Sequence, residues 1–434
     1  MKIRNKYRAT VPDPLILALG LTLVTLILAL ILGTNTGPGL LGVADVLTFW
    51  TMGFWDLLSF SMQMVLILLL GYMLALSPVL DSLSSMLLRF SHKPVQGTVV
   101  VILVSIVVGL INWGLALVLG AVLVKKIAVQ AKKSGNAINY PLMGAAAYVC
   151  MMIWHGGLSG SAPLSVASEG HFLMEKTGII PLSDTIFSPM NLTANALLLI
   201  LLPLAAWWFA KKDTMQIPPD SIQEHQSIQQ HERKRWRPTF LSLFGLLILA
   251  DFVFKTFLNN SSIGLNEINL ILFALVLIVF PNVEQLTKAS GEAIGSTAGI
   301  IIQFPLYAGI MGIMQYSGLL AVMTDWFVNI SSKQSLPLFS FLSASLVNLF
   351  VPSGGGQWAV QGPLIIDVAS QIGVSHAKEV MALAYGDQLT NMLQPFWALP
   401  LLGITGLRAG DIFRYSWRFM MIGLVVFSLI LWFF

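Results

Sequence analysis

The sequence predicts an all-α protein that crosses a membrane several times. Of its 434 residues, 56% are hydrophobic and only 10% are charged, and the mean hydropathy is +0.80. Soluble domains carry about 25% charged residues, so this composition is too apolar for one. Apolar runs of about 20 residues, the length that spans a bilayer, recur along the chain. Three consecutive glycines, Gly354 to Gly356, interrupt one of these apolar stretches. Such a break is typical of a substrate site inside a membrane.

Composition also excludes several classes of function. The net charge of +4 is small, so it bears on membrane orientation and predicts no nucleic-acid partner. A single cysteine, Cys150, excludes a disulfide framework and a cysteine-based zinc site. No Gly-Lys pair occurs, so the chain has no ATP-binding P-loop and uphill transport would need an ion gradient or a partner. We expect no cofactor beyond Na⁺ or H⁺ as a coupling ion.

The first half of the chain, residues 1–210, is predicted to form one transmembrane repeat. Four basic residues precede an apolar run, 14–32, which we interpret as an uncleaved first helix with a cytoplasmic N-terminus. Residues 57–76 form the next predicted crossing, and 77–94 a loop. Residues 97–124 form another crossing, in which Asn112 between two glycines indicates either a locally unwound helix or a kinked one.

A glycine-rich tip follows at residues 154–163, inside the apolar stretch 141–166. Each arm beside the tip has roughly a dozen residues, which is too short to span but suits a re-entrant hairpin. A crossing at 183–208 then leads to the largest polar segment, 211–237, which is basic and is predicted to be a cytoplasmic linker.

The second half, residues 238–434, is predicted to form a second transmembrane repeat and a C-terminal helix. Its predicted crossings lie at 238–257, 268–280, 294–330, 379–402 and 412–434. The topology conflicts at one point. One hairpin and one crossing separate the basic loop 125–133 from the basic linker 211–237, which puts them on opposite sides, although positive charge collects on one side.

The order of features is similar in the two halves. A break at 112–115 precedes the first glycine tip, as a break at 316–319 precedes the second. Asp184 follows the first tip and Asp387 follows the second. Repeats with interrupted helices in matching places indicate the binding site of a secondary transporter.

Several motifs resemble those of a known family. The run Val-Pro-Ser-Gly-Gly-Gly-Gln-Trp-Ala-Val-Gln-Gly-Pro at 351–363 resembles the signature of bacterial short-chain fatty acid transporters. Gly-Asp-Gln-Leu-Thr-Asn at 386–391, Gln394-Pro395, and Phe-Trp-Asp at 54–56 fit that family too. The likeness covers essentially the whole chain. More distantly, the chain is similar to the p-aminobenzoyl-glutamate transporters of the wider ion-transporter superfamily.

The resemblance implies a fold of two inverted repeats, each with a re-entrant hairpin and a discontinuous transmembrane helix. It also implies a multi-pass protein of the bacterial inner membrane that contacts the lipid bilayer. Proteins of related folds are often dimers, so a homodimer is the implied oligomeric state. The chain departs from the dicarboxylate carriers of the superfamily, which have Ser-Asn-Thr at both tips. This departure puts a sodium site of their type in doubt.

A short-chain fatty acid presents one carboxylate on a small apolar tail. Backbone N–H groups of an unwound segment, at the positive end of a following half-helix, can bind such an anion without a buried arginine. The glycines could instead serve only tight helix packing. Trp358 and Trp397 could wall the tail or simply pack. The candidate substrate-binding residues are Ser353, Gly354, Gly355, Gly356, Gln357, Trp358, Gln361, His155, Gly156, Gly157, Ser159 and Ser161.

Asp387 is the most informative charged residue, because an ionisable side chain within a span is costly and usually functional. A carboxylate would repel the substrate, so we expect a cation or a proton beside it. Thr390 and Asn391 could complete an oxygen-lined sodium site, and protonation of Asp387 would serve an H⁺ symporter. Asp184 is the matching candidate in the first half, although a solvated helix start suits it equally. His155 could carry a proton or be a hydrogen-bonded structural histidine.

The sequence therefore predicts a gradient-driven carrier of short-chain monocarboxylates. A dicarboxylate carrier would want two donor sets or an intramembrane arginine, which the sequence does not show. An intramembrane transferase is a weaker alternative, because Asp184, Asp367 and Asp387 are scattered and lack the paired spacing of such enzymes. A passive channel is a third. Chain length, coupling ion, direction of transport and oligomeric state stay open.

Overall fold

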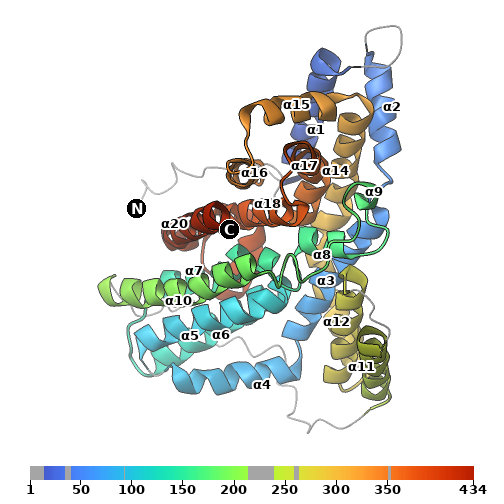
Figure 1. Cartoon of the computed structure of the whole chain (residues 1–434). Helices are drawn as coiled ribbons and strands as arrows, with labels where there is room; N and C mark the ends of the chain where they lie inside the picture. The colour runs from blue at the N-terminus through green and yellow to red at the C-terminus, as the bar shows by residue number, and fades with distance from the viewer. Residues whose placement is uncertain (1–13, 35–40, 92, 214–238, 259–262, 350–352) are drawn as a thin grey trace, which may run out of the picture.

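The computed structural model describes residues 14–34, 41–91, 93–213, 239–258, 263–349 and 353–434, and its elements are helices (Figure 1). The basic N-terminal residues, most of the predicted linker, and Val351 and Pro352 of the glycine motif lie outside the described residues. In the described part, six helical segments are long and apolar enough to cross a membrane. They confirm the predicted multi-pass helical class, and they are 58–75, 113–133, 140–167, 189–212, 298–316 and 409–433.

The chain begins with α1 (Pro14–Leu32), at the predicted bounds, followed by α2 (Val43–Gly53) and α3 (Leu58–Ala75). The segment predicted as a loop at 77–94 is instead largely helical, because it contains α4 (Pro78–Leu87). The Ser77 hydroxyl caps this helix by accepting a hydrogen bond from the Leu80 N–H, at 3.4 Å. A serine cap followed by proline at the first helical position is a strong helix start, so the local sequence contradicts the loop.

Residues 94–133 form two helices, α5 (Pro94–Ile111) and α6 (Trp113–Lys133), which pack side by side as a hairpin. The single residue between them is Asn112, which has extended backbone angles. Its side-chain oxygen caps α6 by accepting from the Leu115 N–H at 2.8 Å, and its amide nitrogen donates to the Ile67 carbonyl at 3.1 Å. The break predicted at Asn112 is therefore a chain reversal, which neither the unwound nor the kinked interpretation anticipated.

The stretch predicted as the first re-entrant hairpin is instead an interrupted helix. It comprises α7 (Tyr140–Tyr148), two short 3₁₀ turns and α8 (Ser161–Ala167). The two arms do not pack side by side, as antiparallel arms of a hairpin would, and Figure 1 shows α8 continuing beyond α7 rather than returning along it. Glycines at 156–160 interrupt the hydrogen bonding, but the chain keeps going in the same direction.

This correction resolves the conflict over the basic loops. Residues 140–167 and α10 (Pro189–Lys212) are each long and apolar enough to cross a membrane. Two crossings, rather than a hairpin and one crossing, therefore separate the basic loop 125–133 from the basic segment that begins at 211. If both segments cross, residues 125–133 and the end of α10 lie on the same side, which agrees with the expectation for positive charge.

The next helices pack against the N-terminal helices α1, α2 and α3. A helical pair, α11 (Phe240–Leu258) and α12 (Leu265–Val279), packs against α3 through α12. The chain continues through α13 (Val283–Ile294) to α14 (Ala298–Tyr316), which packs on α1, α2 and α3. Gly318, with φ of 77°, separates α14 from α15 (Leu319–Ile330), as the predicted break at this point requires.

The last part repeats the order of hairpin and interrupted helix. Two contacting helices, α16 (Leu336–Val347) and α17 (Gly354–Ile372), precede α18 (His376–Thr390), a 3₁₀ turn and α19 (Pro395–Thr405). The final helix is α20 (Ala409–Phe433). By order in the chain, the break before α17 therefore matches the one at Asn112, and the break after α18 matches the glycine tip at 156–161. This order differs from the predicted pairing of the two glycine tips, and the relation between the two halves stays a prediction.

The backbones of α18 and α16 approach one another closely at Gly386. A β carbon added there would lie 2.2 Å from the Phe341 carbonyl oxygen and 2.6 Å from the Ala344 β carbon. Only glycine fits this crossing, so the contact fixes the position of α18 along α16.

We therefore expect Gly386→Ala to destabilise the protein by about 1–3 kcal/mol or more, because the added methyl overpacks a fixed backbone crossing. The check is the melting temperature of detergent-purified protein. Gly403→Ala in α19 is the matched control, since nothing lies within 4 Å of the added carbon. Equal melting temperatures for the two variants would contradict this account of the crossing.

Candidate functional site

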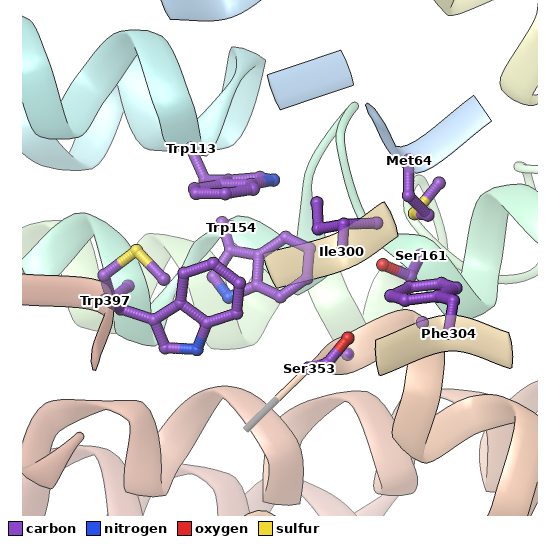
Figure 2. A pocket seen from close by; sticks show the side chains of 11 residues that line it. Met64, Trp113, Trp154, Ser161, Ile300, Phe304, Ser353 and Trp397 are labelled. Atoms are coloured by element: carbon purple, nitrogen blue, oxygen red, sulfur yellow. The ribbon is translucent and has the colours of Figure 1, made fainter. Parts of the chain in front are cut away.

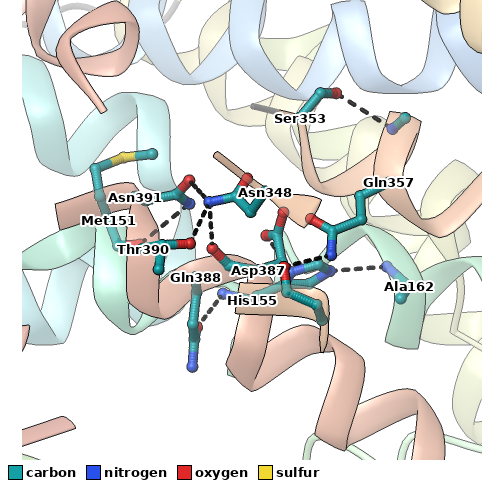
Figure 3. Close-up of polar contacts among 12 residues, drawn as sticks. Met151, His155, Ala162, Asn348, Ser353, Gln357, Asp387, Gln388, Thr390 and Asn391 are labelled. Atoms are coloured by element: carbon teal, nitrogen blue, oxygen red, sulfur yellow. Dashed lines mark hydrogen bonds and ion pairs between the residues drawn. The ribbon is translucent and has the colours of Figure 1, made fainter. Parts of the chain in front are cut away.

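Several of the predicted site residues, among them His155, Asp387 and Asn391, lie where the two interrupted helices meet (Figure 3). His155, from the break between α7 and α8, contacts Asp387, from α18, although 232 positions separate them. Their side chains are fully buried, and His155 Nδ1 lies 2.8 Å from Asp387 Oδ2. This pair joins the two halves of the chain at their centre.

The surroundings of His155 fix its tautomer. Its Nε2 accepts a hydrogen bond from the Ala162 N–H at 3.1 Å, so this nitrogen carries no proton. The proton of the neutral ring is therefore on Nδ1, which donates to the Asp387 carboxylate. The His155 backbone N–H donates to Gln388 Oε1 at 2.9 Å, which holds the ring in place.

Asn348 is the second polar centre of the site. Its amide nitrogen lies 2.7 Å from the Asp387 carbonyl oxygen, 3.0 Å from Thr390 Oγ1 and 2.9 Å from Asn391 Oδ1. An NH₂ group has two hydrogens, so three acceptors exceed what it can satisfy. Within the described part of the chain, its own oxygen Oδ1 is buried without a hydrogen-bond partner, as is Asp387 Oδ1.

Side chains from other helices pair with backbone carbonyl groups at each break. The Tyr148 hydroxyl lies 2.9 Å from the Asn391 carbonyl oxygen and 2.6 Å from that of Gln394, where α18 is interrupted. The amide of Asn191 in α10 donates to the Gly156 carbonyl at 2.8 Å, where the first helix is interrupted. Because buried backbone groups need partners, these side chains make the breaks tolerable within a membrane.

A small cavity lies beside this network (Figure 2). The atom-free space around its lining residues is about 330 Å³ with open solvent included, and the enclosed part is a small fraction of this. Two hydroxyl groups, of Ser161 and Ser353, face it together with the first residues of α17. The remainder of the lining is apolar and aromatic, and among the described residues that line the cavity none is charged. These apolar lining residues are Met64, Trp113, Met151, Trp154, Ile300, Phe304 and Trp397.

The three consecutive glycines open α17 among aromatic rings. A β carbon on Gly354 would lie 2.6 Å from Trp154 Cη2, one on Gly355 2.9 Å from Phe304, and one on Gly356 2.4 Å from a carbon of the Tyr307 ring. Ser353 caps the helix by accepting from the Gly356 N–H at 3.2 Å. The absence of side chains therefore brings the first turn of α17, with Gly354 and Gly355, to the cavity wall.

The first glycine tip is mainly structural. A β carbon on Gly157 would lie 2.3 Å from the Leu110 carbonyl oxygen, and the Ser159 hydroxyl accepts from the Trp113 N–H at 3.2 Å. These contacts join the tip to the turn of the α5–α6 hairpin. Of the predicted residues here, Ser161 lines the cavity, whereas Gly156, Gly157 and Ser159 are absent from its lining. These three residues instead make contacts that stabilise the interrupted segment.

Three predicted residues of α17 also face away from the cavity. Gln357 donates to the Ala344 carbonyl at 2.8 Å and to Gln361 at 3.0 Å, so both glutamines hold α17 against α16. Trp358 is fully buried against Phe172 and does not line the cavity, whereas Trp397 does.

The two other acidic candidates lie outside the network. Asp184 is exposed and accepts a hydrogen bond from the neighbouring Ser183 hydroxyl, at 3.0 Å. It is on the connection before α10, so the solvated helix-start interpretation fits its position. Asp367 in α17 forms an ion pair with Lys176 of α9 (Met174–Thr177), on a partly exposed surface.

Sequence reasoning missed Asn348, Gln388 and Trp154 as members of the site. Asn348 stands alone in an apolar run, and an amide at that place is itself a signal. Gln388 belongs to a quoted motif, but its partner is 233 positions away. Trp154 begins the first glycine tip, where only the glycines and hydroxyls drew attention.

The protein has two interrupted helices whose breaks are hydrogen-bonded by buried side chains, and a small apolar cavity lies beside them. In a multi-pass protein, this arrangement is that of a membrane transporter. The model of the family described as "Short chain fatty acid transporter" matches residues 3–434. The chain is 36% identical over 429 residues to an Escherichia coli (strain K12) protein, covering 96% of this chain and 94% of that one. It is 37% identical over 449 residues to a Haemophilus influenzae protein, covering 99% and 97%. Both are provisionally named as short-chain fatty acid transporters. The chain belongs to the short-chain fatty acid transporter family.

Two solved structures share the fold. The YdaH transporter of Alcanivorax borkumensis matches with a TM-score of 0.60 at 16% identity, covering 97% of this chain and 98% of that one. MtrF of Neisseria gonorrhoeae, described among antimetabolite efflux pumps, matches with a TM-score of 0.64 at 13% identity, covering 98% and 95%. At these identities the likeness is one of fold.

The buried pair predicts a large difference between two aspartates. We expect Asp387→Ala to cost roughly 3–5 kcal/mol of stability, because it leaves the donating nitrogen of His155 buried without an acceptor. Asp184→Ala, at an exposed position, is expected to change stability by less than about 0.5 kcal/mol. Thermal unfolding of both variants in detergent tests this, and an unchanged melting temperature for Asp387→Ala would contradict the buried pair.

Proposed function

We propose that the protein is a secondary active transporter that moves short-chain monocarboxylates, such as butyrate or acetoacetate, across the bacterial inner membrane. The observation that carries this proposal is the cavity, which has hydroxyl groups and a helix start on one side and tryptophan rings on the other. This polarity matches a molecule with one carboxylate and a short apolar tail. The family membership supports the same substrate class.

The carboxylate is proposed to bind at the start of α17. The N–H groups of Gly354 and Gly355 belong to the first turn, which has no intrahelical acceptors for them, and the helix dipole favours an anion there. The hydroxyl groups of Ser353 and Ser161 face the same space. A carboxylate has room for several such donors.

The apolar tail is proposed to extend between Trp113, Trp154 and Trp397. Trp113 makes an edge contact with Trp397, with ring centroids 5.1 Å apart, so the two rings form a closed wall. A second carboxylate on the substrate would enter this apolar part without a cation, because the described lining residues include none. A dicarboxylate carrier is therefore the weaker candidate.

The coupling ion is proposed to bind beside Asp387. Rotation of the Asn348 amide by half a turn would direct Oδ1 toward the Asp387 carbonyl, Thr390 and Asn391, which gives a cluster of oxygen ligands suited to Na⁺. The alternative ion is H⁺, carried by the His155–Asp387 pair. In either case the positive charge offsets the buried carboxylate while an anion is bound nearby.

Transport is proposed to follow alternating access, with the two hairpin and interrupted-helix units related as inverted repeats and the basic segments facing the cytoplasm. A transferase would need a group of acids at one place. Among the described residues, no set of three or more His, Cys, Asp and Glu residues is close enough to hold a metal ion. Asp184, Asp367 and Asp387 have separate partners.

The direct test is uptake of radiolabelled butyrate into proteoliposomes under a sodium or a pH gradient, applied one at a time. We expect accumulation above equilibrium under one of them, and loss of this accumulation in Asp387→Asn, which keeps the size of the side chain but removes its charge. Asp184→Asn is the matched control and is expected to accumulate butyrate normally. Failure of folded wild-type protein to take up any acid of three to six carbons would overturn the substrate class.

The carboxylate site gives a further prediction about affinity. We expect Ser353→Ala to raise the KM for butyrate about tenfold or more, because a hydrogen bond to a charged group contributes roughly 1.5–3 kcal/mol. Ser370→Ala in the same helix is the control, since Ser370 bonds the Ile366 carbonyl and His376 far from the cavity. Initial uptake rates over a range of butyrate concentrations measure the effect. An unchanged KM in Ser353→Ala would place the carboxylate elsewhere.

A further inference from the structure

One residue belongs both to the cavity and to the buried ionisable pair. Trp154 lines the cavity with one part of its indole. Its ring also lies flat against the His155 imidazole, with centroids 4.4 Å apart and an angle of 12° between the planes. His155 in turn donates to Asp387. The cavity and the pair are therefore separated by a single aromatic ring.

The rings of Trp154 and His155 are closely packed. Trp154 is 4% exposed and His155 is fully buried. On the α17 side, a β carbon on Gly354 would lie 2.6 Å from Trp154 Cη2 and 3.0 Å from His155 Cε1, so the first turn of α17 touches both rings. In a close-packed interior, a shift of one of these three groups displaces the others.

The indole of Trp154 also has an unused donor. Its Nε1–H is buried and has no hydrogen-bond partner among the residues that the structure describes. A buried donor without an acceptor is unfavourable, so an occupant of the cavity that offers an oxygen, or that fills the space beside the ring, would hold the indole in one orientation. The orientation of the indole then determines where the imidazole can lie.

We propose that Trp154 is the positioning residue that couples occupation of the cavity to the His155–Asp387 pair. Occupation fixes the indole against the imidazole, and this fixes the geometry in which the pair, or the oxygen cluster beside it, binds the coupling ion. Coupling of this kind requires each ligand to favour the same arrangement of the shared element. The inference rests on the proposed function, since it concerns how substrate and ion depend on one another.

Trp113 provides a matched control within the same cavity. It lines the cavity as Trp154 does, and its ring contacts Trp154 and Trp397. The described ring contacts of Trp113 do not include His155, whereas those of Trp154 do. Truncation of either tryptophan enlarges the cavity, but only truncation at 154 removes the ring that lies on the imidazole.

The test compares Trp154→Leu and Trp113→Leu in proteoliposomes, by gradient-driven accumulation of butyrate and by exchange of labelled for unlabelled butyrate without a gradient. Because both tryptophans line the proposed tail site, we expect both variants to raise the KM for butyrate exchange, so the ratios are compared at saturating butyrate. Only Trp154→Leu is expected to lose most of its accumulation ratio, at least fivefold relative to wild type. Trp113→Leu is expected to raise the KM while keeping the wild-type ratio. Equal ratios in the two variants, whether both normal or both reduced, would overturn the proposal.

A conservative variant covers a failure of Trp154→Leu to fold. Trp154→Phe keeps an aromatic ring on the imidazole and loses the indole N–H, so we expect a wild-type accumulation ratio with a raised KM. A reduced ratio in Trp154→Phe would contradict coupling through the stacked ring. Failure of the proposed function is distinguished because wild-type protein would then show no gradient-driven accumulation at all.

Discussion

The buried hydrogen bond between His155 and Asp387 is the interaction on which the centre of the structure depends. It joins an interrupted helix of the first half to the interrupted helix of the second half, 2.8 Å apart and away from solvent. An ionisable pair at such a place is costly to bury. Both ring nitrogens of His155 have partners, whereas Asp387 Oδ1 has none among the described residues. Here the Ala162 N–H fixes the tautomer of the histidine, and Gln388 holds its backbone.

The same junction explains how two helices can be broken inside a membrane. Each break leaves backbone groups without helical partners, and each is paired by side chains from elsewhere in the chain. Tyr148 serves the break after α18, and Asn191 serves the one before α8. The Tyr385 hydroxyl donates to Asn191 at 3.0 Å, which connects the two sets of contacts. The breaks therefore stabilise one another, and the cavity lies where they meet.

Much of the fold could be predicted because it depends on local composition. The first helix, α1, has the predicted bounds, and the breaks at Asn112 and Gly318 occur where helix-disfavouring residues stand in apolar runs. The three glycines that were predicted to interrupt a helix instead form the first turn of α17, so that prediction is wrong. The direction of the chain after a break was not predictable from the same residues. Asn112 reverses the chain whereas glycines 156–160 let it continue, since the outcome depends on what packs against each break.

The site was predicted in part for a similar reason. Asp387 is conspicuous as a charge within an apolar span, and it is at the centre of the network. Its connection to Asn348, whose amide bonds the Asp387 carbonyl, could not be seen, because the two lie 39 positions apart on different helices. Trp358 and Trp397 were expected either to wall the substrate or simply to pack. Trp358 packs against Phe172, whereas Trp397 lines the cavity together with Trp113 and Trp154. Which face of a helix meets the cavity follows from packing rather than from residue type.

The measurement that tests this account most directly is a crystal structure of the protein with bound 4-bromobutyrate, located by the anomalous scattering of bromine. The account predicts the carboxylate against Ser353 and Gly354 and the bromine peak among Trp113, Trp154 and Trp397. A bromine peak away from these tryptophans, or a carboxylate bound by charged side chains outside the cavity, would contradict it.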